Sequence, residues 1–390
     1  MTYVLAAGTF LMGTTEFVVA GILPEIATDL GVTVATAGLS ITVFAIGMIV
    51  GTPTMAIATL KMPRRLTLSL SLLMFALGHV VVATTSDFAL VLGARFVTAL
   101  ATGAFWAVAA VVGAKAAGPD SSSRALGIVL GGGMLANVIG VPLGAFAGQA
   151  IGWRGPFWAL AVVALLGAVI VHRLITEEAE DGPAPSVRAE LASLRDGRIW
   201  LVLAGCAIVC GSSLAAYSFI SPLLTTTGLT AGSVPFVLAI YGIGAFIGSN
   251  LGGHLGAQRP YAVLFVSATM TFLVLACLCL FSHHTAITLV LIALLGMFGM
   301  STNPVLIGLA VRYADRAPTL ASALSTSSFN FGTAVGSWIA GFALDSALGA
   351  TGPVLVGTVV ASLYFVPLIF LRRKERSRSN AQLRMPEPVA

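Results

Sequence analysis

GWRGPFWALAVVALLGAVIVHR, residues 152–173, shows the pattern that decides the fold. Between Arg154 and Arg173, eighteen consecutive residues include no Asp, Glu, Lys or Arg. A helix that spans the hydrocarbon core of a bilayer needs ~20 mostly apolar residues. Short breaks that are charged or contain Pro and Gly divide the chain into twelve such segments. We place them at 3–23, 36–58, 67–85, 88–112, 125–148, 154–172, 199–223, 233–256, 261–281, 285–311, 320–344 and 353–371.

The composition agrees with this pattern along the whole chain. Of the 390 residues, 57% are hydrophobic and only 9% are charged, whereas roughly 25% are charged in ordinary soluble domains. These values exclude a soluble globular protein, a disordered chain and a disulfide scaffold. The sequence therefore predicts an all-α polytopic membrane protein with twelve transmembrane helices.

The Lys and Arg residues cluster in alternate loops and in the tail. If the N-terminus is cytoplasmic, 18 of the 20 lie inside, Arg154 lies outside and Arg95 lies within a segment. Cytoplasmic loops of membrane proteins carry an excess of Lys and Arg. We therefore expect a multi-pass protein of the cytoplasmic membrane with both termini in the cytoplasm. The net charge of +5 then reflects topology and contact with anionic lipid, and we expect no nucleic-acid partner.

The chain divides into two halves that resemble each other. We expect an N-terminal six-helix bundle at 1–173, a cytoplasmic linker at 174–198, a C-terminal six-helix bundle at 199–371 and a basic cytoplasmic tail at 372–390. The linker is acidic and then rich in Pro, as expected of a domain boundary. At an offset of 197, four Gly and Pro positions recur: Gly31, Gly47, Gly51 and Pro63 match Gly228, Gly244, Gly248 and Pro260.

Small residues also recur every four positions in the second, fifth, eighth and eleventh segments. Examples are Gly47 with Gly51, Gly140 with Gly144, and Gly244 with Gly248. Such stripes allow helices to approach closely in lipid. Two interpretations stay open: ordinary tight packing, or helices along which the two halves rock.

Two charges lie inside apolar segments. Glu16 precedes the outer end of the first segment, and Arg95 follows the outer start of the fourth, each by about seven residues or roughly 10 Å. Charges at such depth normally face a cavity or a partner. One interpretation is a buried ion pair that holds the two helices together. The other is proton coupling: burial raises the pKa of a carboxyl group and a nearby cation lowers it, so Glu16 would exchange a proton while Arg95 tunes it.

Further polar groups within segments predict a cavity that binds substrate. Thr98, Thr102 and Trp106 follow Arg95 along one helix face, and Thr9 precedes Glu16 on another. Each taken singly is also explained by a hydrogen bond between helices, and His79 is interpreted as a packed histidine. The remaining candidates lie in later segments: Asn137, Tyr217, Asn250, Asn303 and Asn330.

The sequence contains no signature of a nucleotide motor or a hydrolase. None of its three Lys follows Gly, so the phosphate-binding loop of nucleotide-driven pumps is missing. The four Cys residues have no zinc-ligand spacing, and all lie in apolar segments. We expect no enzyme activity, cofactor or metal, and a monomer driven by an ion or substrate gradient.

Several motifs resemble those of a known transporter family. Gly13-Thr-Thr-Glu16-Phe17, the loop Lys61-Met-Pro63-Arg64-Arg65-Leu66 that follows Gly51, Arg95, and Gly140-Val-Pro142-Leu-Gly144 are similar to motifs of twelve-helix drug–proton antiporters of the major facilitator superfamily. The Pro63-Arg64-Arg65-Leu66 variant resembles the chloramphenicol exporter branch, whose relatives export arabinose or purines. Leu60 stands where the loop motif carries Asp, so the chain does not supply that acidic group.

The resemblance implies the major facilitator fold and proton-coupled drug export by alternating access. It implies that Glu16 is the embedded acid, that Arg95 is its basic neighbour, and that Pro142 with Gly140 and Gly144 forms a flexible segment. By the same resemblance, Gly51, Arg64 and Arg65 belong to the loop motif linked to conformational change.

The favoured function is proton-coupled efflux of an amphipathic drug, chloramphenicol above all, which would give antibiotic resistance. The first alternative is an exporter of a sugar or a purine nucleobase or nucleoside on the same fold. A second alternative is a receptor or channel without coupling. Stoichiometric proton movement with substrate would exclude that second alternative.

Overall fold

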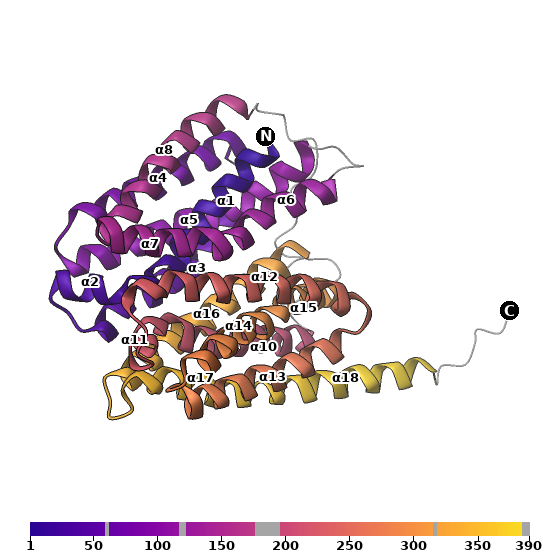
Figure 1. Ribbon diagram of the computed structural model, residues 1–390. Coiled ribbons are helices and arrows are strands. Elements are labelled where there is room, and N and C mark those ends of the chain that lie inside the picture. The colour runs from indigo at the N-terminus through magenta and orange to yellow at the C-terminus, as the bar shows by residue number, and fades with distance from the viewer. Residues whose placement is uncertain (59–61, 117–121, 176–195, 315–317, 384–390) are drawn as a thin grey trace.

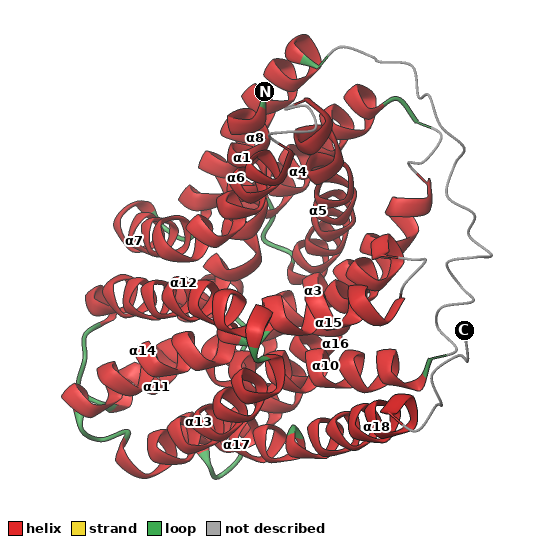
Figure 2. Cartoon of the chain, turned by 90° about the vertical axis from the view of Figure 1, so that its right-hand side faces the viewer, coloured by secondary structure: helices red, strands yellow, loops and turns green. Residues whose placement is uncertain are grey.

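The computed structural model describes residues 1–58, 62–116, 122–175, 196–314 and 318–383, and every regular element in these ranges is a helix (Figures 1 and 2). Inside a bilayer, backbone N–H and C=O groups must be paired within the chain, and a helix pairs nearly all of them. The predicted all-α class is confirmed. The predicted linker at 174–198 lies mostly outside the described residues.

Six membrane segments form the N-terminal half, which is indigo to magenta in Figure 1. A short helix, α2 (Leu23–Leu30), joins the first two. The segments are α1 (Thr2–Phe17) with the turn η1 (Val18–Gly21), α3 (Val34–Ala58), α4 (Arg64–Thr84), α5 (Phe88–Ala116), α6 (Ser122–Leu135) with η4 (Ala136–Gly140) and α7 (Val141–Ile151), and α8 (Arg154–Leu174).

Six further segments form the C-terminal half. Short elements connect them at α11 (Ile220–Thr226), η5 (Ala231–Ser233) and η6 (Gly349–Thr351). The basic tail continues the last segment as a helix as far as Leu383. The segments are α10 (Gly197–Ser218), α12 (Val234–Gln258), α13 (Pro260–Phe281), α14 (Thr285–Ser301) with α15 (Asn303–Ala314), α16 (Pro318–Leu344), and α17 (Gly352–Leu363) with α18 (Phe365–Leu383).

Eleven of these segments are long and apolar enough to cross a bilayer by themselves. The twelfth is α16, which has 27 residues but carries many Ser and Thr side chains and Asn330. Its position explains this composition, because α16 packs against both α10 of its own half and α3 of the other half. Its polar residues therefore face protein, and the predicted twelve-helix architecture holds.

The internal repeat is visible in the backbone and in the packing. Gly31 and Gly228, 197 positions apart, both adopt the left-handed conformation, with φ of 65° and 79°. A Cβ atom on Gly47 would lie 2.9 Å from the carbonyl oxygen of Phe96, and a Cβ atom on Gly244 would overlap the carbonyl oxygen of Ala293. Phe96 and Ala293 are also 197 positions apart, so equivalent helices of the two halves pack in the same way.

Three segments are interrupted shortly before a proline. The π-helical turn η4 precedes Pro142, the break at Thr302 precedes Pro304, and the break at Tyr364 precedes Pro367. Proline lacks an N–H group and its ring clashes with the carbonyl four residues earlier, so the helix must adjust in the turn before it. The sequence ranges predicted these segments without their interruptions.

The outer loop arginine expected from the sequence has a defined partner. Arg154 forms an ion pair with Asp29, stacks on the ring of Trp153, and donates a hydrogen bond of 3.0 Å to the carbonyl of Thr85. The hydrogen bond from Arg154 holds the pKa of the Asp29 carboxyl below its usual range. This contact joins α2 to α8 and to the end of α4.

Four hydrogen bonds join the two halves within the described ranges. They link Thr33 to Asp345 (3.4 Å), Thr42 to Ser337 (2.8 Å), the carbonyl of Ile49 to Ser327 (3.3 Å), and Gln149 to the carbonyl of Ala231 (2.6 Å). Three of these bonds involve Thr33, just before α3, and Thr42 and Ile49 within it. No such bond involves the last nine residues of α3, which lie farthest from α2 and α11. The halves are thus joined more firmly at the α2 and α11 end of the molecule (Figure 1).

Candidate functional site

A small cavity, with room for about one water molecule in this conformation, lies between the two halves. The N-terminal half contributes Glu16 and apolar residues of α1, η1 and α3, and the C-terminal half contributes residues of α10 and α16. Its only acid among the described lining residues is Glu16. The lining residues are Glu16, Phe17, Ala20, Ile41, Phe44, Ala45, Leu214, Tyr217, Ser218, Asn330 and Thr333.

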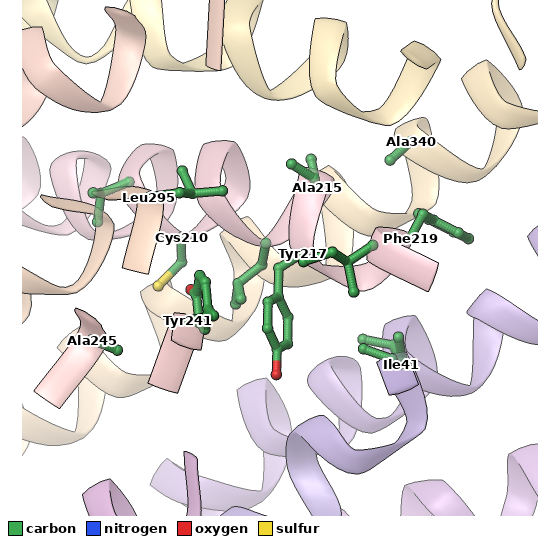
Figure 3. Close-up of a cluster of buried hydrophobic side chains, with 14 of the residues drawn as sticks. Ile41, Cys210, Ala215, Tyr217, Phe219, Tyr241, Ala245, Leu295 and Ala340 are labelled. Atoms are coloured by element: carbon green, nitrogen blue, oxygen red, sulfur yellow. The ribbon is translucent and has the colours of Figure 1, made fainter. Parts of the chain in front are cut away.

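An aromatic wall forms one side of this cavity. The ring of Tyr217 extends from α10 toward the N-terminal half (Figure 3). It meets Phe17 edge to face, with ring centroids 6.1 Å apart, and it stacks at a tilt on Tyr241, with centroids 4.3 Å apart. Such walls bind apolar and aromatic ligands well. A few polar groups, from Ser218, Asn330 and Thr333, give the cavity a mixed character.

The Glu16 carboxylate forms no hydrogen bond and no ion pair with any described residue. Its side chain is half-buried and lies on the cavity. Arg95 is close enough to interact with it electrostatically, but the two groups do not pair directly. A carboxylate without a partner in a partly apolar cavity is well placed to bind and release a proton.

Arg95 is held by neutral groups behind the cavity wall. Only 1% of it is exposed. One guanidinium nitrogen, Nη1, donates to the carbonyl oxygen (3.0 Å) and the hydroxyl (2.9 Å) of Thr15, and Nε donates to the carbonyl of Ser40 (3.4 Å). The guanidinium lies 4.2 Å from the centre of the Phe44 ring, and Nη2 has no hydrogen-bond partner among the described residues. Phe44 therefore contacts Arg95 and also lines the cavity, whereas Arg95 itself does not line it.

The other polar residues predicted on α1 and α5 make internal contacts. Thr9 donates to the carbonyls of Ala6 and Val129, Thr98 to that of Arg95, and Thr102 to that of Thr98. Because all three are buried and none lines the cavity, the structure places them in helix packing. The ring of Trp106 packs against Gly133 on α6.

The predicted asparagines lie in different surroundings. Asn330 lines the cavity and donates to the carbonyl of Thr326. Asn137 lies in the turn η4, where its carbonyl approaches Gly242 of the other half. Asn250 is exposed and bonded within its own helix, and Asn303 lies at the break between α14 and α15 with its side-chain oxygen unpartnered. Of the nine predicted cavity residues, the structure brings Tyr217 and Asn330 to the cavity with Glu16.

The glycine stripes pack within each half. Gly51 faces α5, Gly140 and Gly144 face α1 and η1, and Gly244 and Gly248 face α14. The opposite faces of the same segments contact the other half, through α3 with α16 and through η4 and α7 with α12. These segments therefore pack closely against a helix of their own half on one face and contact the other half on the opposite face. In the loop motif, Arg64 and Arg65 begin α4, and Pro142 lies just after the π-turn.

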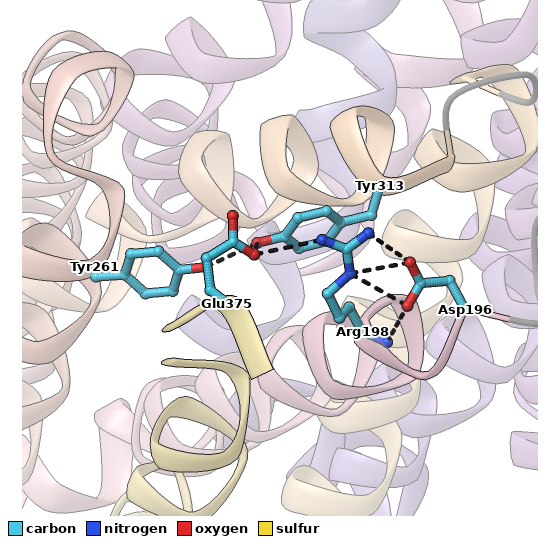
Figure 4. A network of polar contacts seen from close by, with 5 residues as sticks. All are labelled: Asp196, Arg198, Tyr261, Tyr313 and Glu375. Atoms are coloured by element: carbon cyan, nitrogen blue, oxygen red, sulfur yellow. Dashed lines mark hydrogen bonds and ion pairs between the residues drawn. The ribbon is translucent and has the colours of Figure 1, made fainter. Parts of the chain in front are cut away.

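A separate polar network closes the end of the C-terminal half near the start of α10 (Figure 4). Arg198 pairs with Asp196 (2.6 Å) and Glu375 (3.4 Å), and it stacks on the ring of Tyr313 at 4.3 Å. The hydroxyl of Tyr313 also meets Tyr261 at 2.8 Å and donates to Glu375 at 3.3 Å. The network ties α10, α13 and α15 to α18.

We expect Arg198→Ala to lower the free energy of unfolding by about 2 kcal/mol, because hydrogen bonds to charged groups contribute ≈ 1.5–3 kcal/mol. The thermal melting temperature of the purified protein in detergent measures this. Arg259→Ala is the matched control, since Arg259 is exposed and makes no contact of this kind among the described residues. Equal melting temperatures for the two variants would show that the network does not stabilise the fold.

Several lining residues were not predicted from the sequence. Ile41, Phe44, Ser218 and Thr333 line the cavity, yet an apolar or hydroxyl residue in a membrane helix carries no signal of its own. The contact of Gly242 with the other half was also not predicted. Gly242 lies two residues before Gly244, so it is on a different face of α12 from the glycine stripe, and this offset was a weak indication of a second close contact. No group of three or more potential metal ligands occurs in the described part of the chain.

Comparison with known proteins gives consistent results. The family model described as Major Facilitator Superfamily matches residues 5–316 and 203–389. A chloramphenicol resistance protein of Streptomyces lividans is 36% identical over 375 residues, covering 94% of this chain and 95% of that protein. A probable sugar efflux transporter of Mannheimia succiniciproducens is 29% identical over 377 residues, covering 95% and 93%.

A solved structure shares the fold. It is a bacterial homologue of the human lysosomal transporter Spinster in an inward-facing and occupied conformation. The TM-score is 0.76 at 16% sequence identity, and the match covers 96% of each chain. At this identity the likeness concerns the arrangement of helices.

Proposed function

Because the chain belongs to the major facilitator superfamily, a family of membrane transporters, we propose that it exports an amphipathic drug, chloramphenicol first, in exchange for protons. The observation that carries the proposal is the position of Glu16. It is an acid that pairs with no described residue and lies in a cavity formed by both halves, near an arginine held by neutral groups.

The proposed coupling follows from competition for this cavity. A protonated Glu16 is neutral and tolerates an apolar environment, whereas the ionised form needs water or a polar partner. A drug whose hydroxyl or amide groups donate hydrogen bonds to Glu16 would favour the ionised form, whereas the empty cavity would favour the protonated form. Drug and proton would thus occupy the cavity in turn, and each would be released on the opposite side of the membrane.

The contacts between halves support alternating access. We place both termini in the cytoplasm, on the basis of the Lys and Arg distribution. The end of the molecule that carries α2 and α11 is then the outer end, and the hydrogen bonds of Thr33 and Thr42 close it. In this interpretation the structure represents a state closed to the outside, and transport requires that these contacts break.

The chloramphenicol proposal rests on two features. The similar Streptomyces lividans protein is a chloramphenicol resistance protein. Chloramphenicol is a neutral molecule with an aromatic ring, hydroxyls and an amide, and the aromatic wall with Ser218, Asn330 and Thr333 offers partners for each. A sugar or a purine nucleoside is the second candidate, favoured by the sugar efflux relative.

Susceptibility testing of a drug-hypersensitive bacterial host tests the substrate. Expression of the chain is expected to raise the inhibitory concentration of chloramphenicol, and a protonophore is expected to abolish the difference in chloramphenicol accumulation. A matched panel of arabinose and purine analogues tests the second candidate. No change for chloramphenicol together with resistance to a purine or sugar analogue would replace the first proposal by the second.

A further inference from the structure

A chain of hydrogen bonds runs from Arg95 away from the cavity into the core of the N-terminal half. The Thr15 hydroxyl lies 2.9 Å from Arg95 Nη1 and 2.7 Å from His79 Nε2. The other ring nitrogen of His79, Nδ1, lies 2.7 Å from the carbonyl oxygen of Phe75. The chain joins α5, α1 and α4, and its hydroxyl and imidazole are fully buried.

The direction of each hydrogen bond follows from the groups themselves. A carbonyl oxygen only accepts, so Nδ1 of His79 carries a hydrogen and donates to Phe75. A guanidinium only donates, so the Thr15 oxygen accepts from Arg95. The single hydroxyl hydrogen of Thr15 is then free to point at Nε2, which accepts it when His79 is neutral. The Thr15 hydroxyl and both ring nitrogens of His79 are satisfied in this one arrangement.

A charged His79 does not fit this environment. Its Nε2–H would compete with Arg95 for the same Thr15 oxygen, and the hydroxyl hydrogen would lose its acceptor. Two buried cations would also share one neutral partner, which is unfavourable in a low-dielectric interior. The rings of Phe75 and Phe157 cover the imidazole, with centroids 4.0 and 5.8 Å away, and no acid among the described residues contacts it.

We propose that Thr15 and His79 are positioning residues that hold Arg95 on neutral acceptors and so prevent it from closing an ion pair with Glu16. His79 orients the Thr15 hydroxyl, and Thr15 offers Arg95 both its hydroxyl and its backbone carbonyl. This inference rests on the proposed function, because it matters only if Glu16 must exchange a proton.

The consequence concerns the pH at which Glu16 changes its protonation state. The titratable or charged groups facing Glu16 are Arg95 from α5, and Tyr217 and Cys210 from α10; α3 and α16 contribute none among the described lining residues. Among the described residues, Arg95 is thus the one permanent charge that can move toward Glu16. If the Thr15 hydroxyl were lost, Nη1 would keep only its bond to the Thr15 carbonyl. The unpartnered Nη2 and the freed hydrogen of Nη1 would then be drawn to the carboxylate, and protonation of Glu16 would require a lower pH.

Infrared titration of the full-length protein in lipid tests this without any drug. The carboxyl stretch lost in Glu16→Gln reports the protonation of Glu16. Thr15→Val and His79→Phe, which remove one member of the chain, are expected to lower the pH midpoint of this band by about 1 unit or more, the usual effect of a close opposite charge. Thr15→Ser and His79→Gln, which keep a hydroxyl and an acceptor, are expected to keep the wild-type midpoint.

The outcomes separate the inference from the proposed function. Wild-type midpoints in Thr15→Val and His79→Phe, or equal shifts in Thr15→Val and Thr15→Ser, would overturn the inference while a titrating Glu16 still supports proton coupling. Absence of any titrating band removed by Glu16→Gln would overturn both. If His79→Phe fails to fold, the Val and Ser variants of Thr15 decide the question, because they differ chiefly in the hydroxyl. A negative chloramphenicol test affects neither result.

Discussion

Replacing Glu16 by Gln is expected to abolish gradient-driven drug efflux while the protein still folds and inserts. The amide has nearly the same size and suits the half-buried position, but it cannot bind or release a proton in the physiological range. The proposed exchange then loses the only acid among the described residues that line the cavity. Efflux of chloramphenicol from energised cells measures the effect, and we expect the rate to fall to that of cells without the transporter.

Glu25→Gln is the matched control for this variant. Glu25 lies on α2 outside the cavity, where partial burial raises the pKa of its carboxyl. The same chemical change at this position is expected to leave efflux unchanged. Proton-coupled efflux that persists in Glu16→Gln at equal expression would remove the proposed role of Glu16, and equal losses in both variants would indicate a general effect of losing an acid.

Replacing Gly242 by Ala is expected to shift the conformational equilibrium of the two halves. Gly242 lies on α12 against the turn η4 of the other half, where a Cβ atom would overlap the carbonyl oxygen of Asn137 and lie 2.9 Å from the Cα of Val138. Overpacking of this kind costs about 1–3 kcal/mol. Because the contact joins the halves, the cost falls on this conformation, and its population relative to the alternative should drop by roughly 5- to 150-fold.

Gly248→Ala is the control that separates conformation from folding. Its Cβ atom would overlap the carbonyl oxygen of Met297 on α14, inside the same half. It is expected to lower the melting temperature without favouring either state. Pulsed electron resonance between spin labels on α2 and on the loop after α16 measures the separation of the halves at the α2 and α11 end. An unchanged distance distribution in Gly242→Ala would contradict the prediction.

The architecture was predictable because the charges are so few and so unevenly placed. Short charged breaks set the segment boundaries, and the recurrence of Gly47 and Gly51 at Gly244 and Gly248 indicated the repeat that the packing confirms. Glu16 and Arg95 stood out because a charge inside an apolar segment is costly. The sequence left open whether the two groups form an ion pair. Among the described residues they form none, because Arg95 is bonded to neutral groups, and the proton-coupling role of Glu16 stays a prediction.

The cavity was less predictable, since it depends on which helix faces meet. Thr9, Thr98 and Thr102 have the spacing of a lining face, yet each is bonded to a nearby backbone carbonyl. Membrane helices satisfy hydroxyl groups in this way without any role in binding. Phe44 carried no signal, because its role depends on contacts with Arg95 and with the cavity that only the folded chain creates. His79 was interpreted as a packed histidine, and its contact with Thr15 was not foreseen.

The coupling of drug and proton movement is tested most directly in proteoliposomes that contain the purified protein and an internal pH-sensitive dye. A chloramphenicol gradient imposed without any pH gradient should drive protons in the opposite direction through the wild-type protein, with a fixed ratio of protons to drug, and should drive none through Glu16→Gln. Chloramphenicol flux through the wild-type protein with no accompanying proton movement would contradict the proposed exchange.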